Sequence, residues 1–277
     1  MWNFGYHLAR VRGGVAREAY RVLLPKIVRR KIDSPRALDI DVFAYSNEAM
    51  LPEQIASVRS FLKYAGRPNN FTIVSDGTHR PHFVWLLQEV DSCIRVVRAR
   101  DFLPEQSSSR DYFANHPTGK QLALIMSLPR ERPALYLDAD VLFFPGAVAL
   151  ADLLHNYDAP ALYLRDCQVA GDKRLLRDPA EAADPVNTGV IFFCQKLDWS
   201  SAIERLQQLG GAPNFFTNQT VTHLAMHSNG ARPLDPAKFV LQLDDQFQFA
   251  DRYANDSIIL RHYVNPVRHK FWEQIFS

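Results

Sequence analysis

The sequence predicts an α/β protein whose sheet is mostly parallel and flanked by helices, preceded by a basic helical extension. After Pro35, short apolar strand-like runs alternate with helical patterns, which is typical of parallel strands joined through helices. The 277 residues are 47% hydrophobic, enough for one large packed core. Residues 1–31 carry eight Lys or Arg against one acidic residue, Glu18. We therefore expect a basic amphipathic extension over residues 1–34 and a single domain over residues 35–277.

The strands are predicted by short runs of aliphatic and aromatic residues that end at turn-forming or polar residues. Seven runs qualify: residues 38–46, 70–77, 93–99, 134–139, 159–166, 188–193 and 257–264. Between the first two, Ile55, Val58, Leu62 and Ala65 share one helical face, which predicts a βαβ unit at the start of the domain.

Three further helices are predicted from their first residues and their spacing. The stretch TGKQLALIMSL opens with Thr118 and has Gln121 three residues on, a capping-box pattern that places Lys120 in the first helical turn. Helices are also expected from Asp198 to Gly210 and from about Thr217 to residue 227. Residues 98–117 have no clear period, so we expect a functional loop that helps to build an acceptor pocket.

Asp138 and Asp140 end one of the most apolar runs in the chain, ALYLDADVLFFPG. An ionised carboxylate costs much free energy out of water unless a cation or hydrogen-bond donors compensate it. The pair therefore either lies where a strand leaves the sheet or is held by a metal, and both can be true. In open α/β sheets, ligands bind at the carboxyl ends of the strands. The alternative is that one Asp caps the following turn while the other is solvated.

Polar residues also end the other early strands. Tyr45 and Ser46 close the first and Asp76 closes the second, so an aromatic for base stacking and a carboxylate for a base or ribose group are expected at the same crevice. For Asp76 the alternative is strong, because SDGT forms a turn by itself. Lys120 is placed to reach a phosphate or, alternatively, to be solvated.

Three segments, LYLDADVLF, VNTGVIFF and RHYVNPVRHKFW, resemble motifs of the GT-A fold of nucleotide-sugar glycosyltransferases. The details are similar to the retaining family-eight group, which includes glycogenin and bacterial galactosyltransferases. The resemblance implies a donor site around Asp138, Ala139 and Asp140, with Mn²⁺ or Mg²⁺ held against the donor diphosphate. It also implies His262 as the third metal ligand and Lys270 on the diphosphate.

The resemblance further implies that Asn187 and Gly189 lie at the sugar and acceptor side, and the bare Gly189 would make room for the sugar. Two positions depart from the family pattern. Lys270 stands two residues further from His262 than is usual, and Asn218 in TNQT stands where an acid is common. The alternative for the Asn187 segment is a strand opening whose glycine allows close backbone approach.

Elementary chemistry supports a metal at such a site. Breaking a sugar–phosphate bond leaves a diphosphate, whose charge a divalent metal and a nearby cation stabilise without moving a proton. His262 would favour Mn²⁺ over Mg²⁺, and its alternative role is a hydrogen-bonded histidine near a strand end. Gln219 cannot act as a base at neutral pH but could stabilise an oxocarbenium-like sugar, with Asp184 or Asp166 as nearby acid candidates.

Two other functions compete. YLDADVLF also resembles the first motif of haloacid dehalogenase-type Mg²⁺-dependent phosphatases, with Asp138 as nucleophile, Asp140 as acid or base, and Asp244 and Asp245 as a late metal-binding pair. Against this, about three strand candidates precede the motif, whereas it normally belongs to the first strand. A catalytically inactive sugar-nucleotide-binding protein is the third possibility.

The expected substrates are a UDP-sugar and a saccharide, lipid or protein acceptor. A net charge of +2 argues against nucleic acid as a partner, and three widely spaced cysteines suggest reduced core thiols in a cytoplasmic protein.

The basic extension carries an apolar stripe: Leu8, Val11, Val15, Ala19 and Val22 recur at helical spacing, with Arg10, Arg17 and Arg21 largely off it. This suits a helix on the anionic inner membrane face, although a helix docked on the protein body or a flexible arm fits as well.

Overall fold

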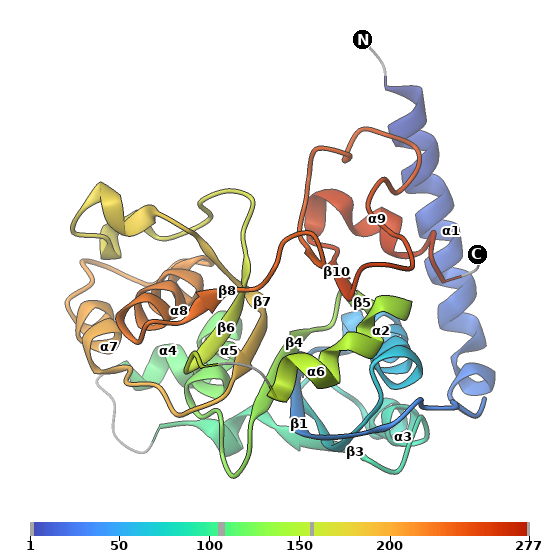
Figure 1. Cartoon of the computed structure of the whole chain (residues 1–277), viewed down its shortest axis with the longest axis horizontal. Coiled ribbons are helices and arrows are strands. Elements are labelled where there is room, and N and C mark those ends of the chain that lie inside the picture. The colour runs from blue at the N-terminus through green and yellow to red at the C-terminus, as the bar shows by residue number, and fades with distance from the viewer. Residues whose placement is uncertain (1–2, 105–108, 156–157, 276–277) are drawn as a thin grey trace.

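The computed structural model describes residues 3–104, 109–155 and 158–275. Its centre is a seven-stranded sheet with the order β3-β2-β1-β4-β7-β6-β8 (Figure 1). The strands are β1 (Ala37–Ser46), β2 (Arg67–Ser75), β3 (Ile94–Arg98), β4 (Ala134–Asp138), β6 (Ala161–Arg165), β7 (Val186–Phe193) and β8 (Arg232–Pro233).

The pairing is parallel from β3 through β2 and β1 to β4, and again between β6 and β8. β7 is inserted antiparallel between β4 and β6. The expected fold class is therefore confirmed, and all seven predicted strands are present. The last of them, however, lies outside this sheet.

A second, three-stranded sheet has the order β5-β10-β9. Its strands are β5 (Val141–Phe143), β9 (Phe239–Val240) and β10 (Leu260–His262). β10 runs antiparallel to β5 with His262 opposite Val141, and the amide of Tyr263 donates to the carbonyl of Asp140 at 2.9 Å. This small sheet therefore brings the C-terminal part of the chain beside the end of β4.

The helices cover both faces of the large sheet. They are α2 (Leu51–Tyr64), α3 (Pro81–Gln88), α4 (Arg110–Asn115), α5 (Pro117–Met126), α6 (Leu150–His155), α7 (Ser200–Gln207), α8 (Thr217–Ser228) and α9 (Arg268–Phe271). Short 3₁₀ turns occupy Glu48–Met50, Ala99–Phe102, Pro145–Ala149, Lys173–Leu175, Pro179–Ala182 and Asn265–Val267.

Alternate strand residues point into two separate cores. In β4, Leu135 and Leu137 pack with Phe61 of α2, whereas Tyr136 packs with Leu122 of α5 and Val221 of α8. The alternation of side chains thus places α2 on one face and α5 with α8 on the other. The site residues lie where the strands end, between these two layers of helices.

Helix α1 (Phe4–Ile27) runs along the side of the molecule and packs against α9 and α2 (Figure 1). Tyr20, Leu24 and Ile27 belong to the same hydrophobic core as the large sheet. The expected helix is therefore present and docked on the body. Trp2, which belongs to the basic extension, lies outside the described residues. The division of the chain at residue 34 stays a prediction.

Two sequence expectations need correction. Cys167 is exposed, so the three cysteines, all free, are not all core residues. Thr118 does not cap α5, because the helix begins at Pro117 with His116 as its N-cap. The Thr118 hydroxyl instead lies 3.0 Å from the hydroxyl of Tyr112.

Candidate metal and donor site

Asp138 is the last residue of β4, and Asp140 follows in the turn toward β5. His262 is the last residue of β10. One ligand atom from each of these three side chains lies within 4.8 Å of the other two. The two sheets therefore assemble the carboxylate, carboxylate and imidazole set that the sequence predicted.

The imidazole ring of His262 is held on both of its nitrogen atoms. Nε2 lies 3.1 Å from Asp140 Oδ1 and 3.8 Å from Asp138 Oδ2, while Nδ1 lies 3.0 Å from Asn187 Oδ1. The side-chain amide of Asn187 donates to Asp166 at 3.0 Å, which leaves its Oδ1 as an acceptor. Nδ1 of His262 therefore carries the proton, and Nε2 faces the carboxylates. This is the orientation in which histidine binds a metal.

The charges of the cluster are strongly coupled. Burial alone would raise the pKa of Asp140, but His262 and Arg268 outweigh it and lower that pKa to about 2. Burial raises the pKa of Asp138, with Asp140 adding to the rise. For His262, burial would lower the pKa, but the two carboxylates raise it overall. The site thus concentrates negative charge that a cation would balance.

An amide donor from α5 and a hydroxyl donor from β4 position Asp138. Gln121 Nε2 and the Tyr136 hydroxyl each donate to Asp138 Oδ1 at 2.9 Å. Asn218 Nδ2 donates to Gln121 Oε1 at 2.8 Å. Gln121 is thus a site residue that the sequence analysis assigned to a capping box. Asn218, noted as a departure from the family pattern, is the donor that orients Gln121.

Gly189 lies against the metal cluster, but not in the way expected. A Cβ atom at this position would lie 2.1 Å from Cε1 of His262 and 2.6 Å from Nδ1. The space that a side chain would need is therefore filled by the imidazole ring. The expectation that Gly189 makes room for a sugar is corrected: it makes room for His262.

Lys270 is not in the crevice. Its side chain is 1% exposed, and Nζ donates to the carbonyl groups of Gln248 at 3.1 Å and Ala250 at 2.5 Å and lies 3.6 Å from Asp245. The expected contact of Lys270 with a diphosphate is therefore wrong, because the ammonium group is enclosed in the core.

The basic residue that does line the crevice is Arg268. Its guanidinium donates to Asp140 Oδ2, and the side chain is one-third exposed at the crevice. The sequence carried a signal for this, because Lys270 stands two residues beyond the usual spacing and Arg268 stands at that spacing.

Of the acid candidates, Asp166 lies in the crevice and Asp184 does not. Asp166 is buried, and its Oδ2 accepts from both Asn187 and Gln219 at 3.0 Å. Asp184 forms an exposed ion pair with Arg165 at 2.7 Å. Asp184 is therefore not placed for the expected catalytic role, whereas Asp166 and Gln219 line the crevice.

The residues expected at the donor side, Tyr45, Ser46, Asp76 and Lys120, are not among those that line the crevice. Tyr45 is half-buried on β1, directly opposite Asp138 in the sheet register. Ser46 is buried. Asp76 Oδ1 accepts from the amide of Thr78 at 2.9 Å, so the turn interpretation is correct for its side chain. Lys120 Nζ donates to the carbonyl of Asp76 at 2.9 Å, which ties α5 to the end of β2.

The crevice in front of these residues has a volume of about 320 Å³. Its apolar side includes Phe215 and Phe216, which are 66% and 44% exposed. Polar groups cover the floor, which is formed by Asp138, Asp140, Asp166, Asn187, Asn218, Gln219 and His262. An open, mixed cavity of this kind suits a polar ligand with one flat ring. The expected loop at residues 98–117 is instead largely helical where it is described, with the turn Ala99–Phe102 and helix α4, and its described residues do not line the crevice. Residues 105–108 lie outside the described residues.

The late acidic pair of the phosphatase hypothesis is not part of this site. Asp245 is fully buried and pairs with Arg261 at 2.9 Å. Asp244 accepts from Arg252 at 3.2 Å on the surface. Both carboxylates are therefore neutralised by arginine residues outside the crevice.

No family model and no curated protein sequence matches the chain. Solved glycosyltransferase structures do match it. The galactosyltransferase LgtC, in complex with donor and acceptor sugar analogues, has a TM-score of 0.54 at 15% identity, over 82% of this chain and 87% of that one. The apo form of mouse xyloside xylosyltransferase 1 has a TM-score of 0.54 at 14% identity, over 84% and 99% of the two chains.

The glycosyltransferase GlyE of Streptococcus pneumoniae TIGR4 has a TM-score of 0.54 at 15% identity. It is longer, and the match covers 86% of this chain but 60% of GlyE. At these identities the likeness shows the fold. The chain therefore has the expected GT-A fold.

Proposed function

We propose that this protein is a metal-dependent glycosyltransferase that transfers a sugar from a UDP-sugar to a saccharide, lipid or protein acceptor, with retention. The observation that carries the proposal is the meeting of Asp138, Asp140 and His262 within 4.8 Å at the end of β4. In this fold that place is the ligand crevice. The glycosyltransferase neighbours support the reaction class.

The residues fit a divalent metal. Two carboxylates and an imidazole nitrogen are suitable ligands for Mn²⁺, and the nitrogen makes Mn²⁺ a better match than Mg²⁺. Asn187 fixes the ring so that Nε2 faces the carboxylates. When bound, such an ion would stabilise the negative charge on the departing nucleoside diphosphate. Open space beside the ligands, within the crevice, would leave positions for phosphate oxygens.

Three other crevice residues have separate roles in the proposed reaction. Arg268 lies at Asp140, where its guanidinium can move onto a phosphate and add a second positive charge. Gln219 lies in the crevice with its side-chain carbonyl free to face a sugar that develops positive charge. Asp166 holds the amides of both Gln219 and Asn187, so it aligns the sugar side with the metal side.

The test is calorimetric titration of UDP into the protein with Mn²⁺ and then with chelator. We expect binding only with Mn²⁺, and its loss in Asp140→Asn. Asp184→Asn is the matched control, since Asp184 is exposed and its φ of 46° is one that Asn adopts readily. Full UDP affinity in folded Asp140→Asn protein would show that the metal assignment is wrong.

Activity assays on the wild-type protein distinguish the competing functions. Slow hydrolysis of a UDP-sugar, followed by NMR of the released sugar, tests turnover and reports whether the anomeric configuration is retained. Mn²⁺-dependent UDP binding without any turnover across a panel of UDP-sugars would favour an inactive binding protein. Mg²⁺-dependent release of phosphate from a phosphomonoester would favour the phosphatase.

A further inference from the structure

Helix α1 has two apolar faces, and only one of them is used inside the protein. The inner face is formed by Ala9, Gly13, Tyr20, Leu24 and Ile27, all buried. A Cβ atom at Gly13 would lie 2.4 Å from the carbonyl oxygen of His269, and the rings of Tyr20 and Trp272 are 5.2 Å apart. The helix is therefore a fixed part of the molecule and not a free arm.

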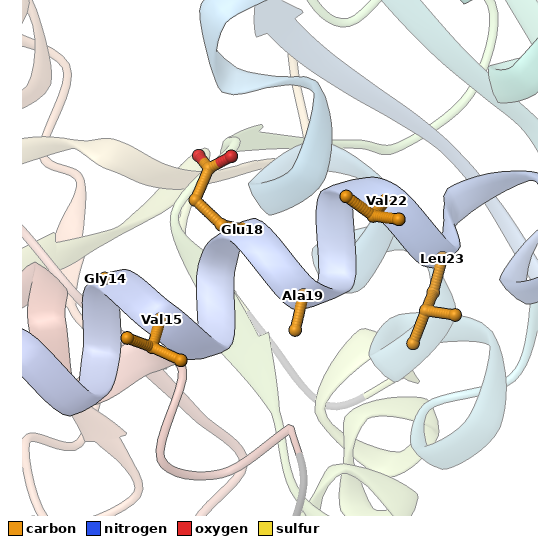
Figure 2. A pocket seen from close by; sticks show the side chains of 6 residues that line it. All are labelled: Gly14, Val15, Glu18, Ala19, Val22 and Leu23. Carbon is orange, nitrogen blue, oxygen red and sulfur yellow. The ribbon is translucent and has the colours of Figure 1, made fainter.

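The outer face carries the apolar stripe noted in the sequence, and it is open to solvent. We define it by seven residues: Phe4, Leu8, Val11, Val15, Ala19, Val22 and Leu23. Phe4 is 78% exposed, Val15 66% and Val22 72%. Figure 2 shows Val15, Ala19 and Leu23 along one edge of the helix and Glu18 on the other. A shallow depression of about 630 Å³ lies over this part of the face.

Aromatic residues from a distant segment lie beside the first turns of α1. Phe247 and Phe249 are 58% and 40% exposed, and the ring of Phe247 lies 5.3 Å from that of Tyr6. The described residues include thirteen large hydrophobic side chains that are exposed, and eight belong to α1 or this segment. Exposed apolar residues are thus concentrated on one side of the molecule, which marks an interaction surface.

The charge around the outer face is positive. Residues 1–31 hold eight Lys or Arg and one acid, Glu18. Glu18 pairs with Arg21 at 2.8 Å, while Arg17 pairs with Glu53 at 2.5 Å and Arg12 with Glu273 at 3.6 Å. The basic residues still outnumber these acids.

At 100° per residue, Arg10, Arg17 and Arg21 lie between the inner and outer faces, while Arg12 and Lys26 fall within the stripe itself. An apolar face with basic residues on it and beside it is the pattern of a helix that lies in the interface of an anionic bilayer.

We propose that the outer face of α1, together with Phe247 and Phe249, docks the protein on an anionic lipid bilayer. The charge decides between this partner and a second copy of the chain. Two copies joined through α1 would bring together two helices with an excess of basic residues, among them Arg10 and Lys26, and like charges at close range oppose association. Anionic headgroups complement the same excess of positive charge, while the valines and phenylalanines enter the acyl boundary. No helix among the described residues combines the length and apolarity needed to cross a bilayer.

The experiment uses the full chain and sedimentation with vesicles. We expect binding to equal parts of phosphatidylcholine and phosphatidylglycerol, little binding to phosphatidylcholine alone, and release by salt. Removing residues 1–31 would expose the core at Tyr20 and Leu24, so point variants are required. Val15→Asp with Val22→Asp should lower vesicle affinity by about tenfold or more. Val148→Asp is the matched control, because Val148 is 45% exposed on another surface.

A charge variant tests whether the basic residues of α1 contribute to vesicle binding. Arg10→Gln with Lys26→Gln should lower affinity for the anionic vesicles about tenfold. Thermal unfolding of each variant reports whether it is folded, so vesicle binding is judged independently of the proposed activity.

Three results would overturn the proposal. The first is wild-type protein that stays in the supernatant with the anionic vesicles at low salt. The second is equal vesicle binding by the Val15→Asp, Val22→Asp protein and the Val148→Asp protein. The third is a wild-type dimer in light scattering that the Val15→Asp, Val22→Asp changes convert to a monomer while vesicles remain unbound, which would assign the face to a second copy.

Discussion

His262 lies with its imidazole ring against the backbone of Gly189, at a distance that no side chain at residue 189 would permit. The proposed third metal ligand thus depends on a glycine in β7, a strand of the other sheet. Asn187, two residues earlier in the same strand, accepts the Nδ1 proton of that ring. One strand therefore provides both the space for His262 and the hydrogen bond that orients it.

Gly189→Ala should displace the ring of His262 and weaken the metal site. A methyl group would lie 2.1 Å from Cε1, so the ring must shift and its bond to Asn187 must lengthen or break. Loss of such a supporting contact typically costs 10- to 100-fold in metal affinity, and we expect about tenfold weaker UDP binding with Mn²⁺. Overpacking should also lower the free energy of unfolding by about 1 to 3 kcal/mol. Calorimetry and denaturant unfolding measure the two effects.

Gly210→Ala is the control for this change, because a Cβ atom at Gly210 meets nothing within 4 Å. Its UDP affinity should equal that of the wild type. An unchanged affinity in Gly189→Ala itself would mean that His262 does not contribute to the metal site.

Arg268 and Lys270 should respond in opposite ways to the same substitution. Arg268→Gln removes a cation from the crevice, so UDP affinity with Mn²⁺ should fall about tenfold. Lys270→Gln removes a buried charge that is bound to two carbonyl groups and faces Asp245. It should lower the free energy of unfolding by about 3 kcal/mol while the folded protein keeps its UDP affinity.

Titration calorimetry and urea unfolding on both variants give four values that test this contrast. The assignment of the phosphate contact to Arg268 is wrong if Lys270→Gln weakens UDP binding in fully folded protein more than Arg268→Gln does.

His269 should make the stability of the protein depend on pH between 4 and 6.5. Burial first, then the charges of Lys270 and Arg10, lower the pKa of His269 to about 4. The unfolded chain, with an ordinary pKa near 6.5, binds more protons in this range, so stability falls as pH drops from 6.5 toward 4 and then levels off. Because the side chain is only half-buried, we expect on the order of 1 kcal/mol.

Urea unfolding at pH 7 and pH 4.5 measures this effect as a difference between the wild type and His269→Gln. The loss of stability on acidification should be smaller in the variant by that amount. Identical losses in the two proteins would show that His269 is not responsible.

The sequence predicted the strands well because each is a short apolar run that ends at a polar residue. It predicted the carboxylate pair for the same reason, since Asp138 and Asp140 interrupt such a run. It could not predict Gln121, because a glutamine three residues after a threonine matches a local capping pattern, whereas its partner Asp138 is distant in sequence. Local patterns cannot reveal which tertiary contact outweighs them.

The sequence analysis named Lys270 as the basic residue at the crevice, whereas the structure places Arg268 there, and the reason is similar. Both are basic residues near the end of the chain, and only the path of the backbone after β10 determines which one faces the crevice. The 3₁₀ turn at Asn265–Val267 and the short helix α9 direct Arg268 toward Asp140 and Lys270 into the core. The apolar stripe of α1 was identified correctly, but sequence periodicity does not say which of two apolar faces will be buried.

The pairing of β10 with β5 has a consequence for synthesis on the ribosome. His262 on β10 lies opposite Val141 on β5, and the two strands leave the ribosome far apart in time. Contacts of such long sequence separation form late in folding. Until β10 has emerged, the nascent protein holds two carboxylates, no imidazole and an unfilled space over Gly189. A ribosome-bound chain that lacks β10 should therefore fold much of its large sheet without gaining affinity for the donor nucleotide.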